Sequence, residues 1–319
     1  MFRIGILGAA DIAYNKFMPA LEKVEGAECA GVASNTAEKL NKFTQKYSVK
    51  VYSSYDAVIA DENVDCVYIP LPPAFHYEWA RKALLAGKHV FLEKPSTTSL
   101  EHTRELVQLA AERGLVIQEN YMFQYHAQLK AIRDIIDSGE LGKVRLYRTS
   151  FGFPRRPGRD FRYIKELGGG TMLDNGGYTV KLASILLGDS IRLVSSHLDY
   201  EEQTGVDIFG SAEFVNDDGV VAQVAFGMDC QYQCSLEVWG SLGRLTTGRI
   251  YTAPAGLKVN ALIENGSGNR EIELPCDDHF AKSIECFIRA VTDEEYREEL
   301  AAGCIRQAAL VEAIKEHGN

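Results

Sequence analysis

Residues 1–120 alternate short runs of β-branched and aromatic residues with segments of helical periodicity. This pattern predicts strands at 2–7, 27–34, 51–52, 65–69, 89–92 and 116–119. It predicts helices between them, at 11–23, 37–47, 55–60, 75–86 and 100–113. Parallel strands need crossover connections, and helices usually supply them. The first part of the chain is therefore expected to be a doubly wound α/β domain around a parallel sheet.

The pattern changes after residue 120, where long strand-like segments dominate at 144–151, 191–198, 207–214, 220–228 and 234–239. The sequence Asn216-Asp217-Asp218-Gly219 predicts a hairpin turn between two of them. Helices are predicted at 128–138, 172–187, 279–291 and 294–316. Long strands with few helices predict a large, mainly antiparallel open sheet, in an α+β domain. We therefore expect a dinucleotide-binding domain at 1–120 and a substrate-binding and oligomerisation domain at 121–319, with the last helices free to pack back on the first domain.

Composition and charge limit the classes of protein to consider. The 319 residues carry a formal net charge of −10, which argues against partners such as nucleic acid or an anionic membrane surface. No apolar run approaches 18 residues, and the first residues do not resemble a secretory signal. The seven scattered cysteines are expected to be reduced thiols of a cytoplasmic protein, and neither they nor the seven histidines show the spacing of metal ligands.

The first predicted strand runs into a turn that is typical of dinucleotide sites. The sequence from Gly8 to Ala13 reads G-x-A-x-x-A, with Ala10 where a second glycine is usual. Gly8 permits the tight turn, and the N–H groups at the start of the following helix suit a pyrophosphate. The added methyl group of Ala10 shifts this phosphate without excluding it. The expected cofactor-binding residues here are Gly8, Ala9, Ala10, Asp11 and Ile12.

The end of the second predicted strand favours NADP over NAD. An acidic residue there would bind the 2′-hydroxyl of NAD, and none is present. Ser34 and Asn35 can instead hydrogen-bond a 2′-phosphate, and Lys39 on the next helix can neutralise it. The loop has no arginine, so NAD also stays possible.

Two further clusters carry candidate chemistry. Glu93-Lys94-Pro95 follows the fifth predicted strand, at the sheet edge where open α/β sheets bind ligands. About eighty residues later, Asp174 lies four residues before Tyr178, which places both on one side of a helix. A phenol, whose pKa is about 10, is a weak acid or base unless a cation favours its phenolate. Lys94 is expected to supply that cation.

These segments together resemble the glucose–fructose oxidoreductase/inositol dehydrogenase/rhizopine catabolism (Gfo/Idh/MocA) family over nearly the whole chain. The matching segments are the opening turn, the loop 69–76, Glu93-Lys94-Pro95, Glu119-Asn120, and Gly168-Gly169-Gly170 leading to Asp174 and Tyr178. Members of this family often have histidine at the place of Tyr178. Tyrosine there looks like the sugar 3-ketoreductases and the dimeric dihydrodiol dehydrogenases, and the segments 120–123, 151–157 and 160–163 are similar to nucleotide-sugar ketoreductases.

The resemblance implies roles for individual residues. Tyr178 would donate or accept the proton during hydride transfer, with Lys94 beside it. Asp174 would bind a substrate hydroxyl or tune Tyr178, although a role as a first-turn helix acid is an open alternative. Glu93 would bond a ribose hydroxyl or orient Lys94.

Other residues are candidates for binding the cofactor or the substrate. Pro70, Leu71 and His76 would border the nicotinamide, and Asn120 and His126 would contact the sugar. The basic segment around Arg155 suits a diphosphate, because arginine forks match its oxygens; a solvated loop or a subunit contact is the alternative. Its candidate substrate-binding residues are Arg155, Arg156, Arg162 and Tyr163.

The sequence therefore predicts an NAD(P)-dependent oxidoreductase that interconverts a keto group and a secondary alcohol on a carbohydrate-like substrate. Reduction of a nucleotide-linked ketosugar is the leading hypothesis. A free-sugar or trans-dihydrodiol dehydrogenase is the alternative, and a non-catalytic dinucleotide-binding sensor is the alternative from another class. The family resemblance implies a homodimer or a homotetramer.

Overall fold

The computed structural model describes residues 1–318, and they divide into two compact units. Unit 1 consists of Met1–Asn120 and Phe280–Ala308, and unit 2 of Tyr121–His279 with the segment from Ala309 to the end of the chain. Each unit thus combines one long segment with a short piece from the C-terminal helices. Within 1–318, no helix has both the length and the apolar character needed to cross a bilayer.

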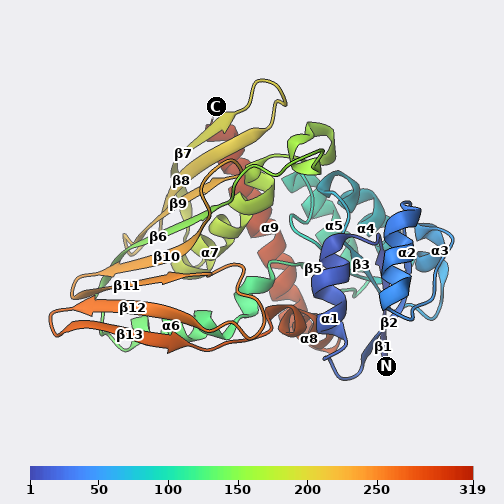
Figure 1. The fold of residues 1–319 in the computed structure, drawn as a ribbon, viewed down its shortest axis with the longest axis horizontal. Coiled ribbons are helices and arrows are strands. Elements are labelled where there is room, and N and C mark those ends of the chain that lie inside the picture. The colour runs from blue at the N-terminus through green and yellow to red at the C-terminus, as the bar shows by residue number, and fades with distance from the viewer. Residues whose placement is uncertain (319) are drawn as a thin grey trace. The chain divides into compact units, whose positions relative to one another are not determined.

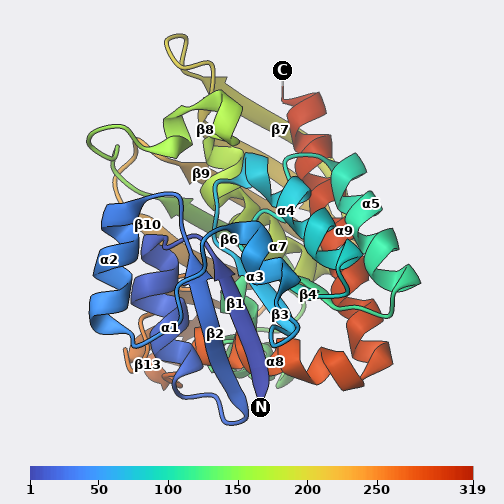
Figure 2. The same cartoon turned by 90° about the vertical axis from the view of Figure 1, so that its right-hand side faces the viewer.

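Unit 1 is built on a five-stranded parallel sheet in the order β2-β1-β3-β4-β5. Its strands are β1 (Phe2–Leu7), β2 (Ala27–Ala33), β3 (Cys66–Ile69), β4 (His89–Leu92) and β5 (Ile117–Glu119). Its helices are α1 (Met18–Leu21), preceded by the π-helical η1 (Ala13–Phe17), α2 (Ala37–Lys46), α3 (Tyr55–Ala60), η2 (Pro73–Phe75), α4 (His76–Leu85) and α5 (Leu100–Glu112). The parallel, doubly wound sheet that the sequence predicts is confirmed (Figure 2).

Successive residues of a strand point to opposite sides of this sheet, and both sides are covered by packed elements. One side packs the apolar residues of β3 and β4, such as Val67 and Leu92, against α3, α4 and α5. On the other side Tyr68 stacks on Phe17 with ring centroids 3.8 Å apart, and Phe91 stacks on Phe287 at 4.9 Å. Phe287 belongs to α8 (His279–Thr292), so the C-terminal segment completes this core.

Unit 2 is built on an eight-stranded sheet in the order β13-β12-β11-β10-β6-β9-β8-β7 (Figure 1). All neighbouring pairs are antiparallel except β6 and β9. The strands are β6 (Val144–Gly152), β7 (Arg192–Tyr200), β8 (Asp207–Val215), β9 (Val221–Gly227), β10 (Gln233–Gly240), β11 (Gly243–Gly248), β12 (Val259–Asn265) and β13 (Gly268–Leu274). The expected large, mainly antiparallel sheet is therefore confirmed.

Helices cover one face of this sheet. Those in contact with β6 and β9 are the π-helical η6 (Met172–Gly176) and α7 (Gly177–Leu187). The other helical segments of unit 2 are η3 (Met122–Tyr125), α6 (Ala127–Asp137), η4 (Phe161–Tyr163), η5 (Lys165–Leu167) and the end of α9 (Glu294–His317). Strand β10 shows the resulting alternation, because Leu236 and Val238 are buried whereas Glu237 and Trp239 face outward. The outward side chains form what we call the open face.

Two local predictions differ from the structure. The predicted strand at 51–52 is not part of the parallel sheet, because Val51 makes only an isolated bridge with Val32. Strands β11, β12 and β13 lie beyond the last strand that the sequence pattern predicts. The alternation of β13 is weak, since most of its side chains are polar and exposed.

Candidate functional site

The turn after β1 has the geometry that a dinucleotide requires. Gly8 has φ +117°, and a Cβ there would lie 2.9 Å from Cδ2 of Leu71, so the position suits only glycine. The N–H of Gly8 donates to the carbonyl oxygen of Ala33, and a helical stretch begins at Asp11. The first N–H groups of a helix have no intrahelical acceptors and bind phosphate readily. The residues from Gly8 to Ile12 therefore fit a pyrophosphate.

The loop after β2 presents the predicted NADP-selective side chains. Ser34 is half-buried, and its Oγ accepts a hydrogen bond from the N–H of Thr36 at 3.2 Å. Asn35 and Lys39 are exposed, and Lys39 lies in the first turn of α2. A polar, partly cationic group of this kind suits a 2′-phosphate, although Glu38 in the same turn of α2 adds a carboxylate.

His76 clamps the loops that follow β3 and β4. Its ring is fully buried, with Nδ1 2.8 Å from the carbonyl oxygen of Pro95 and Nε2 2.8 Å from that of Leu71. Burial lowers the pKa of His76, and the two carbonyls oppose this shift without reversing it. A neutral imidazole has a single N–H, so His76 donates to one of these carbonyl oxygens and lies in close contact with the other, between the backbone of Leu71 and that of Pro95.

The segment after Lys94 is held by further buried bonds. Lys94 itself is half-buried, and its peptide bond to Pro95 is cis. Oε1 of Glu119 accepts a hydrogen bond from the N–H of Ser96 at 2.7 Å. The hydroxyl of Thr103 contacts those of both Ser96 and Thr97. Lys94 therefore projects from a rigid backbone at the carboxyl end of β4.

Glu93 is a buried carboxylate in the same turn. Its Oε1 accepts hydrogen bonds from the Tyr68 hydroxyl at 2.6 Å and from Nδ2 of Asn120 at 2.9 Å. Burial raises the pKa of Glu93, while these two donors and the charge of Lys94 lower it, and the net shift is upward. Asn120, which was predicted to bind the substrate, is fully buried and lies beside the Glu93 carboxylate, to which it donates a hydrogen bond.

Tyr178 lies in unit 2, on the first turn of α7, inside a cage of aromatic rings. The rings of Tyr121, Phe151 and Tyr251 lie 5.1 to 5.8 Å from its own ring, nearly all edge-to-face. Its hydroxyl donates to Sδ of Met122 at 3.6 Å. The ring is thus packed firmly, a geometry that fixes the direction of its phenol.

The helix that carries Tyr178 starts with a π-helical segment anchored at two points that sequence reasoning missed. Oδ2 of Asp207 on β8 accepts a hydrogen bond from the N–H of Met172 at 2.5 Å. Asn175 donates from Nδ2 to the carbonyl oxygens of Phe151 and Gly227. π-helical segments occur often at functional sites. Asn175 stands inside the polar cluster that the sequence reveals, whereas Asp207 is distant in the chain and carries no local signal.

Asp174 occupies this π-helical segment and is paired with Arg162. Nε of Arg162 donates to Oδ2 of Asp174 at 2.6 Å, and its Nη1 donates to Oδ1 of Asp160 at 3.0 Å. Burial lowers the pKa of Arg162, but the carboxylates of Asp174 and Asp160 raise it further, so the guanidinium stays charged. The guanidinium of Arg162 therefore binds two carboxylates, those of Asp174 and Asp160.

The rest of the basic segment lies at the surface of unit 2. Arg155 pairs with Glu201, and its guanidinium lies 4.6 Å from the ring centroid of Tyr163. The Tyr163 hydroxyl accepts from the N–H of Arg156 and donates to the carbonyl oxygen of Met228. Tyr163 thus fixes the loop that displays Arg155 and Arg156. Arg155 donates from both Nη atoms to Glu201, so a phosphate at this exposed site would compete with that carboxylate.

His126 contributes to unit 2 as a helix cap. It is buried, and its Nδ1 accepts a hydrogen bond from the N–H of Gln128 at the start of α6. The structure therefore groups the predicted residues within each unit: the cofactor candidates, Lys94 and Asn120 in unit 1, and Tyr178, Asp174, His126 and the basic segment in unit 2. Among residues 1–318, no cluster of His, Cys, Asp and Glu is suited to hold a metal ion.

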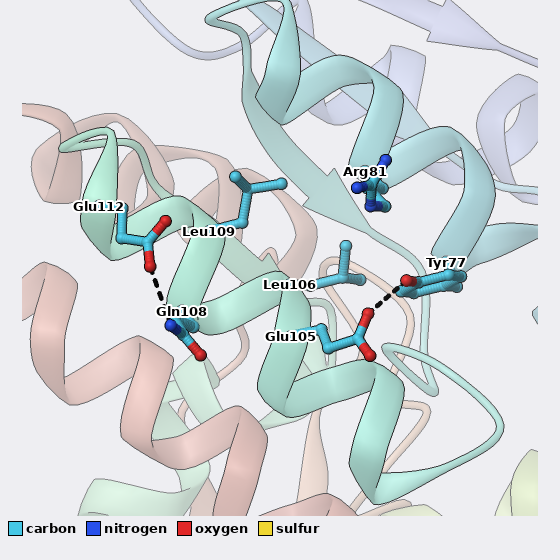
Figure 3. A pocket seen from close by; sticks show the side chains of 7 residues that line it. All are labelled: Tyr77, Arg81, Glu105, Leu106, Gln108, Leu109 and Glu112. Atoms are coloured by element: carbon cyan, nitrogen blue, oxygen red, sulfur yellow. Dashed lines mark hydrogen bonds between the residues drawn. The ribbon is translucent and has the colours of Figure 1, made fainter.

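A pocket on unit 1 lies apart from these residues. It is lined by side chains of α4 and α5, among them Tyr77, Arg81 and Glu105 (Figure 3). The Tyr77 hydroxyl donates to Glu105, and Gln108 donates to Glu112 at 2.9 Å. None of the predicted site residues lines this pocket, so we do not assign the activity to it.

Comparison with known proteins identifies the chain. Residues 2–121 match the model described as "Oxidoreductase family, NAD-binding Rossmann fold", and residues 129–246 match the Gfo/Idh/MocA C-terminal domain. The chain belongs to the Gfo/Idh/MocA oxidoreductase family. The predicted family, and with it the prediction of an NAD(P)-dependent oxidoreductase, is confirmed.

Relatives within the Gfo/Idh/MocA family narrow the comparison. The chain is 38% identical over 98% of its length to a dTDP-3,4-didehydro-2,6-dideoxy-α-D-glucose 3-reductase of Actinomadura kijaniata, covering 94% of that protein. It is 40% identical, with the same coverage, to the reductase of that name from Streptomyces violaceoruber. The structure of KijD10, a 3-ketoreductase from Actinomadura kijaniata in complex with NADP and TDP-benzene, matches with a TM-score of 0.95 at 38% identity, covering 99% of this chain and 97% of that one. Variants of KijD10 with a tyrosine replaced by phenylalanine, or a lysine replaced by alanine or glutamate, have also been solved.

Proposed function

We propose that this chain is an NADP-dependent ketoreductase that acts on a nucleotide-linked ketosugar. The observation that carries the proposal is the similarity to the dTDP-sugar 3-reductases over nearly the full length of both chains. KijD10, which shares this similarity, was solved with NADP and a TDP-linked ligand. The exposed Arg155 and Arg156 supply the kind of cations that a diphosphate substrate needs.

The cofactor site is assigned to unit 1. The turn from Gly8 to Ile12 would hold the pyrophosphate, and Ser34, Asn35 and Lys39 would hold the 2′-phosphate. When bound, NADPH supplies the hydride that reduces the keto carbon. Pro70 and Leu71 are also assigned to the cofactor site. They belong to the loop after β3, where His76 contacts the carbonyl oxygen of Leu71. We assign His76 to holding this loop and the segment at Pro95.

The proton chemistry is assigned to Tyr178, with Lys94 as the cation that favours its phenolate. The Tyr178 phenol would give its proton to the keto oxygen as the carbon gains hydride, which yields the secondary alcohol. Asp174, held by Arg162, would accept a hydrogen bond from a sugar hydroxyl. Arg162 is therefore assigned to orienting Asp174, and the diphosphate is assigned to Arg155 and Arg156.

We propose that a second copy of the chain covers the open face of unit 2, giving a homodimer or a homotetramer. Trp239 and Leu242 are exposed there, with exposed fractions of 53% and 66%. Arg148 pairs with Glu237 beside them, and Arg244 pairs with Glu264. The charges around Trp239 are thus paired, so this part of the face would meet a second copy without strong repulsion. The seven free cysteines agree with a cytoplasmic protein.

The proposal is tested by titrating the purified protein with NADPH and NADH while following nicotinamide fluorescence, and then by adding TDP. We expect tighter binding of NADPH, and an increase in Tm with TDP that inorganic phosphate does not reproduce. The decisive measurement is oxidation of NADPH in the presence of a TDP-linked ketosugar. Oxidation with free sugars or diols alone would instead place the protein with the free-sugar or dihydrodiol dehydrogenases.

A further inference from the structure

A line of buried hydrogen bonds joins the C-terminal helix α8 to Glu93. Nε2 of Gln118 donates to Oγ of Ser283 at 3.0 Å, and this hydroxyl donates to Oδ1 of Asn120 at 2.8 Å. Nδ2 of Asn120 then donates to Oε1 of Glu93 at 2.9 Å. Ser283 and Asn120 are fully excluded from solvent, and Gln118 is 1% exposed. All four residues belong to unit 1, although Ser283 follows Asn120 by 163 positions in the chain.

The direction of each bond is fixed by the number of protons available. A hydroxyl has a single proton, and the Ser283 hydroxyl gives it to Asn120 while it accepts one from Gln118. Oδ1 of Asn120 therefore points toward Ser283, and its amide N–H group points toward Glu93. The flipped amide would set an acceptor oxygen against the Glu93 carboxylate, which is unfavourable in a buried site. Ser283 and Glu93 therefore both favour the orientation in which the amide N–H group of Asn120 faces Glu93.

The orientation matters because Glu93 is a carboxylate in a buried position. Burial favours its neutral form, and only donors or cations oppose this. The titratable groups that act on it are Tyr68 from β3 and Lys94, the next residue in the chain, and the neutral donor is Asn120, which follows β5. The Asn120 bond is the one of these that depends on a residue from the far end of the chain.

We propose that Ser283 is a positioning residue for the cofactor site: by orienting the amide of Asn120, it holds the Glu93 carboxylate charged and fixed beside Lys94. The inference rests on the proposed function only for its effect on catalysis. Its effect on Glu93 is a property of the protein alone. Substitution of Ser283 removes the proton that Oδ1 of Asn120 accepts, so this buried oxygen loses its donor, the amide is held less firmly and its bond to Glu93 is weakened.

The experiment is an infrared pH titration of the protein without cofactor, following the carboxylic-acid band that Glu93→Gln abolishes. In Ser283→Ala, the midpoint of this band should move to higher pH by roughly one unit, the size expected when a buried charged group loses a hydrogen bond. Ser283→Cys, which puts a somewhat larger but weakly donating thiol in the same place, should give the same direction of shift and serves if the alanine variant does not fold. Ser283→Thr should restore the wild-type midpoint.

Cys286→Ala is the matched control, because it removes a side chain of similar size from the same helix without touching the line of bonds. Its midpoint should equal that of the wild type. An unchanged midpoint in both Ser283→Ala and Ser283→Cys would overturn the proposal. A second readout is the pH dependence of kcat/KM for NADPH, whose acid limb should move to higher pH in the two variants while kcat on the alkaline side stays within about twofold. A wild-type protein that reduces no ketosugar would refute the proposed function and leave the infrared result intact.

Discussion

Arg162 holds Asp174 through a hydrogen bond of 2.6 Å from Nε to Oδ2, and the same guanidinium holds Asp160. The side chains of Arg162 and Asp174 are only 18% and 9% exposed, so this ion pair is largely shielded from water. The pairing links the basic segment to the π-helical segment before Tyr178. It fixes the orientation of the Asp174 carboxylate, whereas an acid in a flexible first turn would sample several orientations.

Replacing Arg162 by Met should leave the buried carboxylate of Asp174 and the half-buried one of Asp160 without this cation. We expect the free energy of unfolding to fall by about 3 kcal/mol, in the range observed when one partner of a buried pair is removed. Urea unfolding measures this loss, and Arg159→Met, which changes an exposed arginine of the same segment, should stay within about 0.5 kcal/mol of the wild type. A loss for Arg162→Met as small as that of the control would show that the pair contributes little.

Replacing Arg155 and Arg156 together by Ala should weaken binding of the substrate's diphosphate. We expect KM for a TDP-linked ketosugar to rise roughly tenfold with a smaller change in kcat, because these contacts exist before and during hydride transfer. Steady-state kinetics with NADPH in excess measures this difference. Lys143→Ala, which removes an exposed cation elsewhere in unit 2, is the control. Equal effects of both changes would remove the diphosphate role from Arg155 and Arg156.

Gly8→Ala should impair cofactor binding more than folding. The new Cβ would lie 2.9 Å from Cδ2 of Leu71, and φ +117° is unfavourable for alanine. We expect Kd for NADPH to rise at least tenfold, about 1.4 kcal/mol, by fluorescence titration. Gly87→Ala is the matched control, since Gly87 has φ +77° but a Cβ there would meet no atom within 4 Å. Unchanged NADPH binding in Gly8→Ala would place the pyrophosphate elsewhere.

Stability should fall in mild acid because of buried histidine. Burial lowers the pKa of both His76 and His89, so below about pH 6.5 the unfolded chain binds protons that the folded chain does not. Stability is complete above this pH and decreases as the pH falls, by up to about 1.4 kcal/mol per group for each pH unit. Urea unfolding at pH 7.5 and 5.5 should show a smaller decrease in His76→Gln than in the wild type. The exposed His197→Gln should behave like the wild type; identical slopes in all three proteins would exclude His76 as a source.

Trp239→Glu should separate the proposed subunits. The substitution places a charge at the centre of the open face, where burial against a second copy would be costly. Light scattering after size-exclusion chromatography should show a wild-type oligomer and a smaller species for the variant. Leu85→Glu changes an apolar residue of unit 1 that is 43% exposed and should keep the wild-type mass. A variant that keeps this mass would show that the open face does not join subunits.

The sequence reveals the parallel sheet well because each of its strands is buried on both faces and followed by a helix. It reveals the edge of the second sheet poorly. Strand β13 keeps only Ile272 and Leu274 from solvent, so periodicity gives little signal there. Val51 illustrates the opposite error, since a β-branched residue beside an aromatic one looks like a strand but makes a single bridge.

The chemistry at the strand ends is also visible in the sequence, whereas the supporting contacts are not. Lys94 and Tyr178 stand in recognisable local patterns, although the roles assigned to them are still predictions. The partners of Asn120 and Met172, namely Ser283 and Asp207, come from distant segments with no pattern of their own. Asn120 was predicted to contact the sugar, and its hydrogen bond to Glu93 could be identified only from the structure.

Unit 1 is not a continuous stretch of chain, and this limits how the protein can be dissected or recombined. A fragment ending at Asn120 would carry all five parallel strands and yet lack Phe287, the ring that stacks on Phe91. Exposure of that aromatic surface would favour aggregation over folding. A single genetic crossover near residue 120 would likewise pair the nucleotide half of one parent with the foreign helix of another. To transfer the dinucleotide domain of this protein intact, both Met1–Asn120 and Phe280–Ala308 would have to be moved together.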